Sequence, residues 1–142
     1  LEIYGAVDDL WITPEEKLII VDYKSTSTTR EIDLDSEYKR GFKRQAEIYQ
    51  WIFRGMGFDV ANTAYFVYAN AGRNRPKFDG RLEFEMSIIP HEGDDSWVEE
   101  TIFAMKECLD SEKIPDPDPE CEYCQYRESA NEALSNKPLK LL

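Results

Sequence analysis

The segment LIIVDYKSTST, residues 18–28, decides how this sequence folds, because its aliphatic and β-branched run ends on charged residues. Residues 18–21 predict a buried β-strand. Asp22 and Lys24 follow at strand positions that charged side chains avoid unless the protein uses them. Side chains two residues apart in a strand point to the same face, so we expect Asp22 and Lys24 to share one face of a sheet.

The preceding segment predicts a strand that pairs with this one. LEIYGAVDDLWI, residues 1–12, alternates in hydrophobicity, and the turn-like TPEE separates it from the next strand. A hairpin would bring Asp8 or Asp9 at the end of one strand close to Asp22 on the other. Two carboxylates and an ammonium at one sheet edge indicate metal-assisted phosphodiester hydrolysis, in which the carboxylates hold Mg²⁺ or Mn²⁺.

In such a site Lys24 would stabilise the attacking hydroxide and the oxygens of the transition state. A structural Asp–Lys ion pair or a solvated strand end explains the same residues, and for this short motif alone it is the commoner explanation. The rest of the chain therefore has to distinguish the two interpretations.

A helix is predicted from about residue 37 to residue 56, with Ser36 as its cap and Gly57 after its end. Its apolar positions follow helical spacing and predict a core-facing stripe: Phe42, Ala46, Tyr49, Ile52 and Phe53. Gln45 borders that stripe, four residues before Tyr49.

Cations crowd the first half of the predicted helix, where the helix dipole disfavours them: Lys39, Arg40, Lys43 and Arg44. A phosphate backbone bound in one groove would explain this placement, and an ordinary solvated helical face is the alternative. Because the net charge is −12, DNA can bind only at such a local basic patch and not over the whole surface.

The remaining segments alternate between strands and helices. Two further strands are predicted in TAYFVYAN and RLEFEMSII, a helix near DDSWVEETIFAMKECL, and a short last helix in SANEAL. We expect an α/β fold, with a small mixed central β-sheet flanked by helices, in one domain over residues 1–142. Three cysteines without a secretory signal predict a reducing cytoplasmic setting, and no apolar run approaches the length of about 20 residues that a membrane helix needs.

The segments GAVDD, IIVDYKS and QAEIY resemble the GxxD, (D/E)xK and QxxxY elements of the RecB-like branch of the PD-(D/E)XK nuclease superfamily, in that order. The resemblance covers roughly the first half of the chain. It implies a restriction-endonuclease-like core and Mg²⁺- or Mn²⁺-dependent hydrolysis of DNA by in-line attack of water. Members include exonucleases of recombination and repair, CRISPR adaptation nucleases and phage proteins. A noncatalytic DNA-binding or assembly module that kept the fold is the alternative.

The resemblance also implies roles for individual residues. Asp8 and Asp22 would be metal ligands, the backbone carbonyl of Tyr23 a further ligand, and Lys24 the catalytic lysine. Gln45 and Tyr49 would organise the site and touch the DNA strand. Asp9 is the alternative first aspartate, but the GxxD spacing from Gly5 favours Asp8.

The sequence departs from the family pattern at both ends. Family members carry a helix before the first strand, often with a Glu or His that completes the metal site, and this chain begins without Met inside a strand-like segment. We therefore expect a missing upstream segment, in a larger parent protein or complex. PECEYCQYRE is similar to the CxxCxYR tail of relatives that bind a [4Fe–4S] cluster, but residues 128–131 lack the further cysteine. Four thiolates are normally needed, so no cluster is expected.

Overall fold

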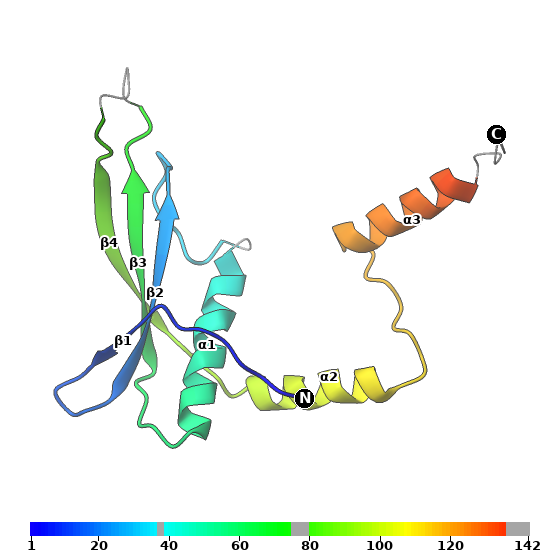
Figure 1. Cartoon of the computed structure of the whole chain (residues 1–142), viewed down its shortest axis with the longest axis horizontal. Coiled ribbons are helices and arrows are strands. Elements are labelled where there is room, and N and C mark those ends of the chain that lie inside the picture. Colours follow the sequence, from blue (N-terminus) through cyan, green and yellow to red (C-terminus); the bar gives the residue numbers. More distant parts are fainter. Residues whose placement is uncertain (37–38, 75–79, 136–142) are drawn as a thin grey trace. The chain divides into compact units, whose positions relative to one another are not determined.

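The computed structural model describes residues 1–36, 39–74 and 80–135. Figure 1 shows the order of the elements: β1 (Asp9–Ile12), β2 (Leu18–Thr26), α1 (Arg40–Gly55), β3 (Thr63–Ala71), β4 (Phe84–Glu92), α2 (Val98–Asp110) and α3 (Glu122–Ser135). The predicted order of strands and helices is therefore confirmed. Residues 75–79, in the predicted connection between β3 and β4, lie outside the described residues.

The four strands form one mixed sheet in the order β1-β2-β3-β4. β1 and β2 make the predicted antiparallel hairpin, in which Asp9 lies opposite Val21. The strand predicted over residues 1–12 is too long, because β1 begins at Asp9, which therefore lies at its start and not at its end. β2 and β3 run parallel, and α1 provides the connection that a parallel pair requires. β3 and β4 are antiparallel, so the α/β fold with a mixed sheet is confirmed.

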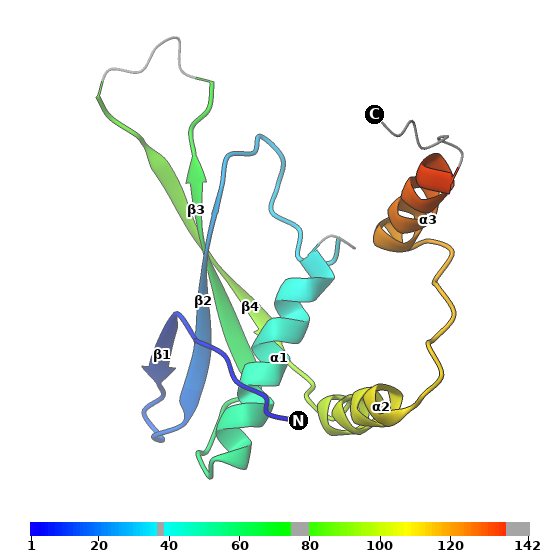
Figure 2. The ribbon, with the colours of Figure 1, turned by 45° about the vertical axis from the view of Figure 1, so that its right-hand side comes forward.

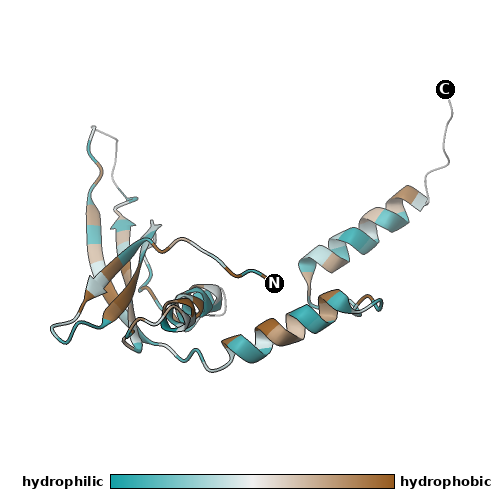
Figure 3. Ribbon diagram, turned by 60° about the horizontal axis from the view of Figure 1, so that its bottom comes forward, coloured by the Kyte–Doolittle hydropathy of each residue, from teal (hydrophilic) through white to brown (hydrophobic). Residues whose placement is uncertain are grey.

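α1 packs against one face of the sheet, as Figures 1 and 2 show. The core lies between them and contains Ile20, Ala46 and Phe66, each at most 2% exposed. Figure 3 shows the hydrophobic residues of β2 in brown, and α1 carries both hydrophobic and hydrophilic residues. Burial of the apolar side of α1 against β2 and β3 is what fixes the helix over Asp22 and Lys24, which lie on the same sheet face.

The ends of α1 differ from the prediction. Lys39 takes the N-cap position without a side-chain cap, whereas the hydroxyl of Ser36 donates to the carbonyl of Asp33, 3.2 Å away. Ser36 as the cap is therefore wrong, and the predicted first helical residues, 37 and 38, lie outside the described part of the chain. At the other end Gly57 has a φ of 91°, a conformation that glycine adopts without strain, and its N–H donates to the Arg54 carbonyl.

The chain forms two compact units, residues 1–103 and 104–142, and α2 begins in the first and ends in the second. α3 spans 14 residues, so the short last helix predicted in SANEAL is too short. Its earlier start follows from Asp118, whose side chain and backbone carbonyl accept the N–H groups of Glu120 and Cys121. The expectation of a single domain stays a prediction. Among the described helices, none is long and apolar enough to cross a bilayer.

Candidate active site

The carboxylates of Asp8 and Asp9 point to different surroundings. Asp8 Oδ2 accepts the backbone N–H of Tyr23 at 2.9 Å, directly beside Asp22 in β2. Asp9 lies opposite Val21, on the sheet face that Asp22 does not share. Asp9 Oδ2 accepts a hydrogen bond from the Tyr23 hydroxyl at 2.8 Å, so the Asp9 carboxylate interacts on the sheet face away from Asp22. The structure thus brings Asp8, and not Asp9, next to Asp22.

Asp22 is buried, with 7% of its surface exposed. Burial raises the pKa of its carboxyl, the neighbouring ammonium of Lys24 lowers it, and the carboxylate of Asp8 raises it again, with a net upward shift. Lys24 forms an ion pair with Asp22 Oδ2, yet no donor in the described residues meets hydrogen-bond geometry at that oxygen. The buried carboxylate of Asp22 therefore lies beside the exposed carboxylate of Asp8, and the ammonium of Lys24 does not fully offset the burial of Asp22.

Lys24 is held in place by two neighbours on the same sheet face. Its ammonium makes the ion pair with Asp22 and lies 4.6 Å from the centroid of the Phe42 ring in α1, which is a cation–π distance. Only 20% of its side chain is exposed. The predicted shared face of Asp22 and Lys24 is therefore present, and Phe42 is a partner that the sequence did not predict.

Gln45 and Tyr49 connect α1 to the segment that carries Asp8. The Gln45 amide donates to the Tyr49 hydroxyl at 3.2 Å, and that hydroxyl donates to the Ala6 carbonyl at 2.8 Å. A Cβ at Gly5 would lie 2.6 Å from the Tyr49 ring, closer than such contacts allow. The absence of a side chain at Gly5 lets the ring reach Ala6, two residues before Asp8.

The four cations of α1 have different surroundings. Lys43 pairs with Asp35, the Lys39 ammonium lies 5.4 Å from the centroid of the Tyr68 ring, and the Arg44 guanidinium lies 5.9 Å from that of Trp97. Arg40 is exposed and makes no ion pair with any described residue. A hollow of about 480 Å³ is lined by Arg40, Lys43, Arg44, Glu47, Trp97 and Thr101. The helix therefore offers a basic surface that also presents an aromatic ring.

The donor set suits a hard divalent cation. Asp8 and Asp22 supply carboxylate oxygens, and Asp22 Oδ2 is a buried oxygen whose described partner is the ammonium of Lys24, which a bound cation could replace. No group of three or more His, Cys, Asp or Glu residues converges within the described part of the chain. Mg²⁺ keeps several waters and binds through one or two carboxylates, so this pair fits it.

A partly buried polar network beside the same hollow has a structural role. Glu47 accepts the indole N–H of Trp97 at 2.8 Å, and its second oxygen lies 2.9 Å from His91 Nε2. His91 belongs to β4. Both carboxylate oxygens of Glu47 are already engaged, and the network joins α1 to β4 and to the segment before α2.

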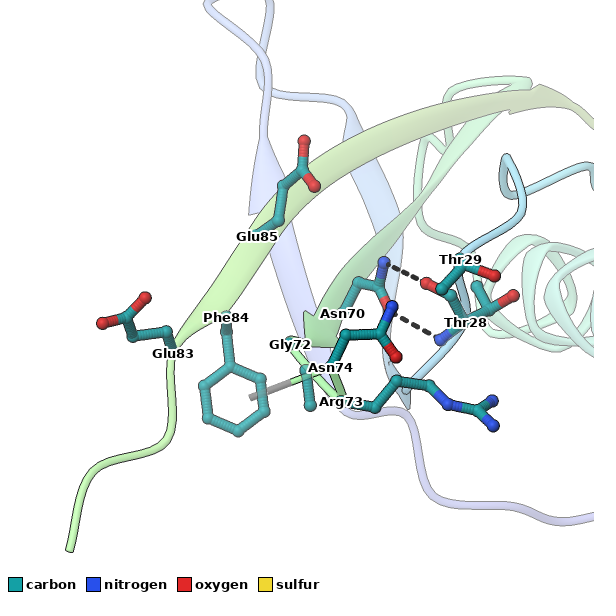
Figure 4. Close-up of a pocket in the computed structure, with 10 residues that line it drawn as sticks. Thr28, Thr29, Asn70, Gly72, Arg73, Asn74, Glu83, Phe84 and Glu85 are labelled. Atoms are coloured by element: carbon teal, nitrogen blue, oxygen red, sulfur yellow. Dashed lines mark hydrogen bonds between the residues drawn. The ribbon is translucent and has the colours of Figure 1, made fainter. Parts of the chain in front are cut away.

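A pocket beside the sheet is separate from the carboxylate pair. It has a volume of about 360 Å³, and Figure 4 shows its lining, in which the Phe84 ring lies among polar side chains. Asn70 accepts the Thr28 N–H at 2.9 Å and donates to the Thr28 carbonyl at 3.0 Å. This bracket fixes the segment that leaves β2, and none of the predicted site residues lines the pocket.

Cys121 and Cys124 are free thiols at the start of α3. Hydrogen bonds from the backbone N–H and then the thiol of Cys124 lower the pKa of Cys121. Hydrogen bonding to Cys121 raises the pKa of Cys124. These contacts make Cys121 and Cys124 a hydrogen-bonded pair of thiols.

Comparison with known proteins gives one match. The sequence model of the PD-(D/E)XK nuclease superfamily matches residues 1–129. No curated protein and no solved structure matches the chain. The match spans the hairpin, α1, the rest of the sheet and the start of α3, and so covers more of the chain than the short segments that first resembled the family.

Proposed function

Because the chain belongs to the PD-(D/E)XK nuclease superfamily, we propose that it is a Mg²⁺- or Mn²⁺-dependent deoxyribonuclease of the RecB-like type, acting as an exonuclease. The observation that carries this proposal is the meeting of Asp8 and Asp22 beside Lys24 on one sheet face. The order of the GxxD, DxK and QxxxY segments supports the RecB-like branch. The free cysteines fit a reducing cytoplasm.

In this mechanism Asp8 and Asp22 would hold the cation, and the Tyr23 carbonyl would be the third protein ligand. When bound, the cation would act as a Lewis acid that lowers the pKa of water and offsets charge on the phosphate. Lys24 leaves Asp22 when the phosphate arrives and donates to oxygens that become more negative in the transition state. The aromatic ring of Phe42 keeps its ammonium close to the site throughout.

DNA would lie across the first half of α1. Arg40 and Arg44 are exposed and can contact phosphates without breaking an ion pair to any described residue, whereas Lys43 must exchange Asp35 for a phosphate. Trp97 beside Arg44 gives a surface on which a nucleobase can stack. The Gln45–Tyr49 pair keeps the Asp8 segment in place next to this surface.

The proposal is tested by incubating the protein with end-labelled linear single- and double-stranded DNA in Mg²⁺, Mn²⁺ or EDTA. We expect metal-dependent release of short products from the ends. Asp22→Asn should abolish cleavage, and Lys24→Ala should reduce it by orders of magnitude while DNA affinity, measured by fluorescence anisotropy, changes little. Lys17→Ala, which removes an exposed cation on the β1–β2 turn, is the matched control and should cleave normally.

Different outcomes lead to different conclusions. DNA binding without metal and without cleavage would support a noncatalytic module that kept the nuclease fold. Cleavage that survives in Asp22→Asn would assign activity to a contaminant or to other residues. Equal losses of binding and cleavage in Lys24→Ala would show that this lysine attracts DNA rather than acting in the reaction.

A further inference from the structure

Tyr68 is a buried residue of β3 whose hydroxyl has no hydrogen-bond partner among the described residues. Only 3% of its surface is exposed. In the parallel register it lies opposite Lys24, on the sheet face that carries Asp22. Buried hydroxyls are nearly always hydrogen-bonded in proteins, so an unused one beside a candidate active site needs a partner.

Packing fixes the ring of Tyr68, so its hydroxyl is the part of the side chain that can still form a hydrogen bond. The ring belongs to the main apolar core, and the ammonium of Lys39 lies above its face, 5.4 Å from the centroid. A ring held in this way cannot turn its hydroxyl out to solvent without opening the core. The partner must therefore come to the hydroxyl from inside the site.

Asp22 is the acceptor that the surroundings offer. In the parallel register Asp22 lies opposite Phe66, two residues before Tyr68, so Asp22 and Tyr68 are diagonal neighbours on one sheet face. Burial raises the pKa of the Tyr68 phenol, and the negative charge of Asp22 raises it further, in agreement with this placement. Asp22 Oδ2 is itself buried, and among the described residues its ion-pair partner is the ammonium of Lys24. In the structure the ammonium of Lys24 offsets the negative charge of Asp22. Once the carboxylate holds a divalent cation, that cation repels the ammonium.

We propose that Tyr68 is a positioning residue whose hydroxyl donates a hydrogen bond to the Asp22 carboxylate, orienting that carboxylate for a divalent cation after Lys24 turns to the substrate. This inference rests on the proposed metal-dependent function and adds a residue to it. Donors behind a ligating carboxylate orient the ligand, and losing one lowers metal affinity by about 10–100-fold.

The test is Tyr68→Phe, which keeps the ring and removes only the hydroxyl. Mn²⁺ binding is measured by titration calorimetry without DNA, beside wild type and Asp22→Asn. We expect the Mn²⁺ dissociation constant to rise by about tenfold. The melting temperature in EDTA should stay the same or rise, because an unpaired buried hydroxyl is removed. At saturating Mn²⁺ the cleavage rate should return close to that of wild type.

Tyr65→Phe is the matched control. Tyr65 lies three residues earlier in β3, on the other sheet face, where its ring packs 5.6 Å from that of Trp11. This change removes the same atom from the same strand and should leave Mn²⁺ affinity unchanged. Equal weakening by both changes would show a general effect on the sheet and would overturn the proposal.

The remaining outcomes separate this inference from the proposed function. Wild-type Mn²⁺ affinity in Tyr68→Phe would overturn the positioning role, whether or not cleavage changes. A cleavage rate that stays low at saturating Mn²⁺ would mean that Tyr68 touches the substrate instead. A large fall in melting temperature would make the hydroxyl structural. If wild type binds no Mn²⁺ and cleaves no DNA, the proposed function fails and the inference fails with it.

Discussion

At the scale of single residues, Asp22 is the group whose ionisation opposes folding. Its pKa is higher in the folded protein than its ordinary value of 3.8, chiefly through burial, and this shift already includes the favourable effect of Lys24. Stability from such a group is fully present below its pKa in the unfolded chain and is lost as the pH rises through its folded pKa. Without metal, the wild type should therefore lose stability on this account as Asp22 ionises.

Asp22→Asn should be more stable than wild type in EDTA at neutral pH, and its advantage should shrink as the pH falls towards the ordinary pKa of aspartate. Urea unfolding at several values between about pH 4 and pH 8 checks this prediction. An advantage that does not depend on pH would contradict it.

Asp9→Asn is the control of opposite sign. Hydrogen bonds from the Tyr23 hydroxyl and the Leu10 N–H lower the pKa of Asp9, so ionised Asp9 stabilises the fold. Asp9→Asn should lose stability at neutral pH, and the loss should shrink as the pH falls through the lowered folded pKa.

The sequence could predict which side chains share a strand face and that Asp8 or Asp9 lies near Asp22, but not the contacts of Tyr68 and Phe42 with this site. The two-residue period of a strand was enough to place Asp22 beside Lys24. The contacts of Tyr68 and Phe42 with this site depend on the parallel register of β2 and β3 and on the rotation of α1. Those are tertiary quantities that a single strand or helix pattern does not contain.

At the scale of elements, Gln50 is a buried polar residue of α1 that the apolar pattern of the helix did not predict. Gln50 is fully buried, and its amide donates to the carbonyls of Ala61 and Asn62 at 3.1 and 2.7 Å. Gly93, at the end of β4, donates its N–H to the same Asn62 carbonyl. α1, the start of β3 and the end of β4 therefore meet at one carbonyl.

Gly93→Ala should destabilise the protein, because a Cβ there would lie 2.2 Å from Gln50 Oε1. Overpacking of this kind lowers the free energy of unfolding by about 1–3 kcal/mol, which urea unfolding can measure. Gly55→Ala, at a helical position with open space around it, should instead be neutral or stabilising. Equal stability changes in the two variants would contradict the steric argument.

The element boundaries show a similar limit of prediction. The apolar stripe was sufficient to predict α1, because burial of that stripe dominates helix formation. The start of α3 was predicted too late, since it depends on one aspartate, Asp118, accepting two backbone N–H groups. Such local hydrogen bonds cannot be recognised from the hydrophobic pattern of the sequence.

At the scale of the whole molecule, a net charge of −12 has to be reconciled with a polyanionic substrate. The exposed cations Arg40 and Arg44 on α1 offer the local reversal of sign that this requires. The composition could exclude binding over the whole surface, and the fold class followed from the alternation of strands and helices. The composition could not reveal that Lys43 is paired with Asp35.

Replacing Arg40 and Arg44 together with Gln should weaken DNA binding to a similar extent for all sequences. The slope of log affinity against log salt should become shallower by about 0.7–0.9 for each phosphate that the protein no longer neutralises. Anisotropy titrations over a range of salt concentrations measure it. Lys17→Gln changes a cation in the hairpin turn that pairs with Asp59, after the C-terminal end of α1, and should leave the slope unchanged. A parallel loss in both variants would indicate net charge alone.

The close approach of Gly5 to Tyr49 has an evolutionary consequence. The Tyr49 ring fills the space beside Gly5, so a Cβ added at Gly5 would lie 2.6 Å from that ring. Substitutions at the two positions are therefore coupled, because a larger residue at position 5 is compatible only with a smaller one at position 49. A selection in which both positions are randomised should therefore return paired solutions, and the glycine should stop being required wherever the tyrosine is lost.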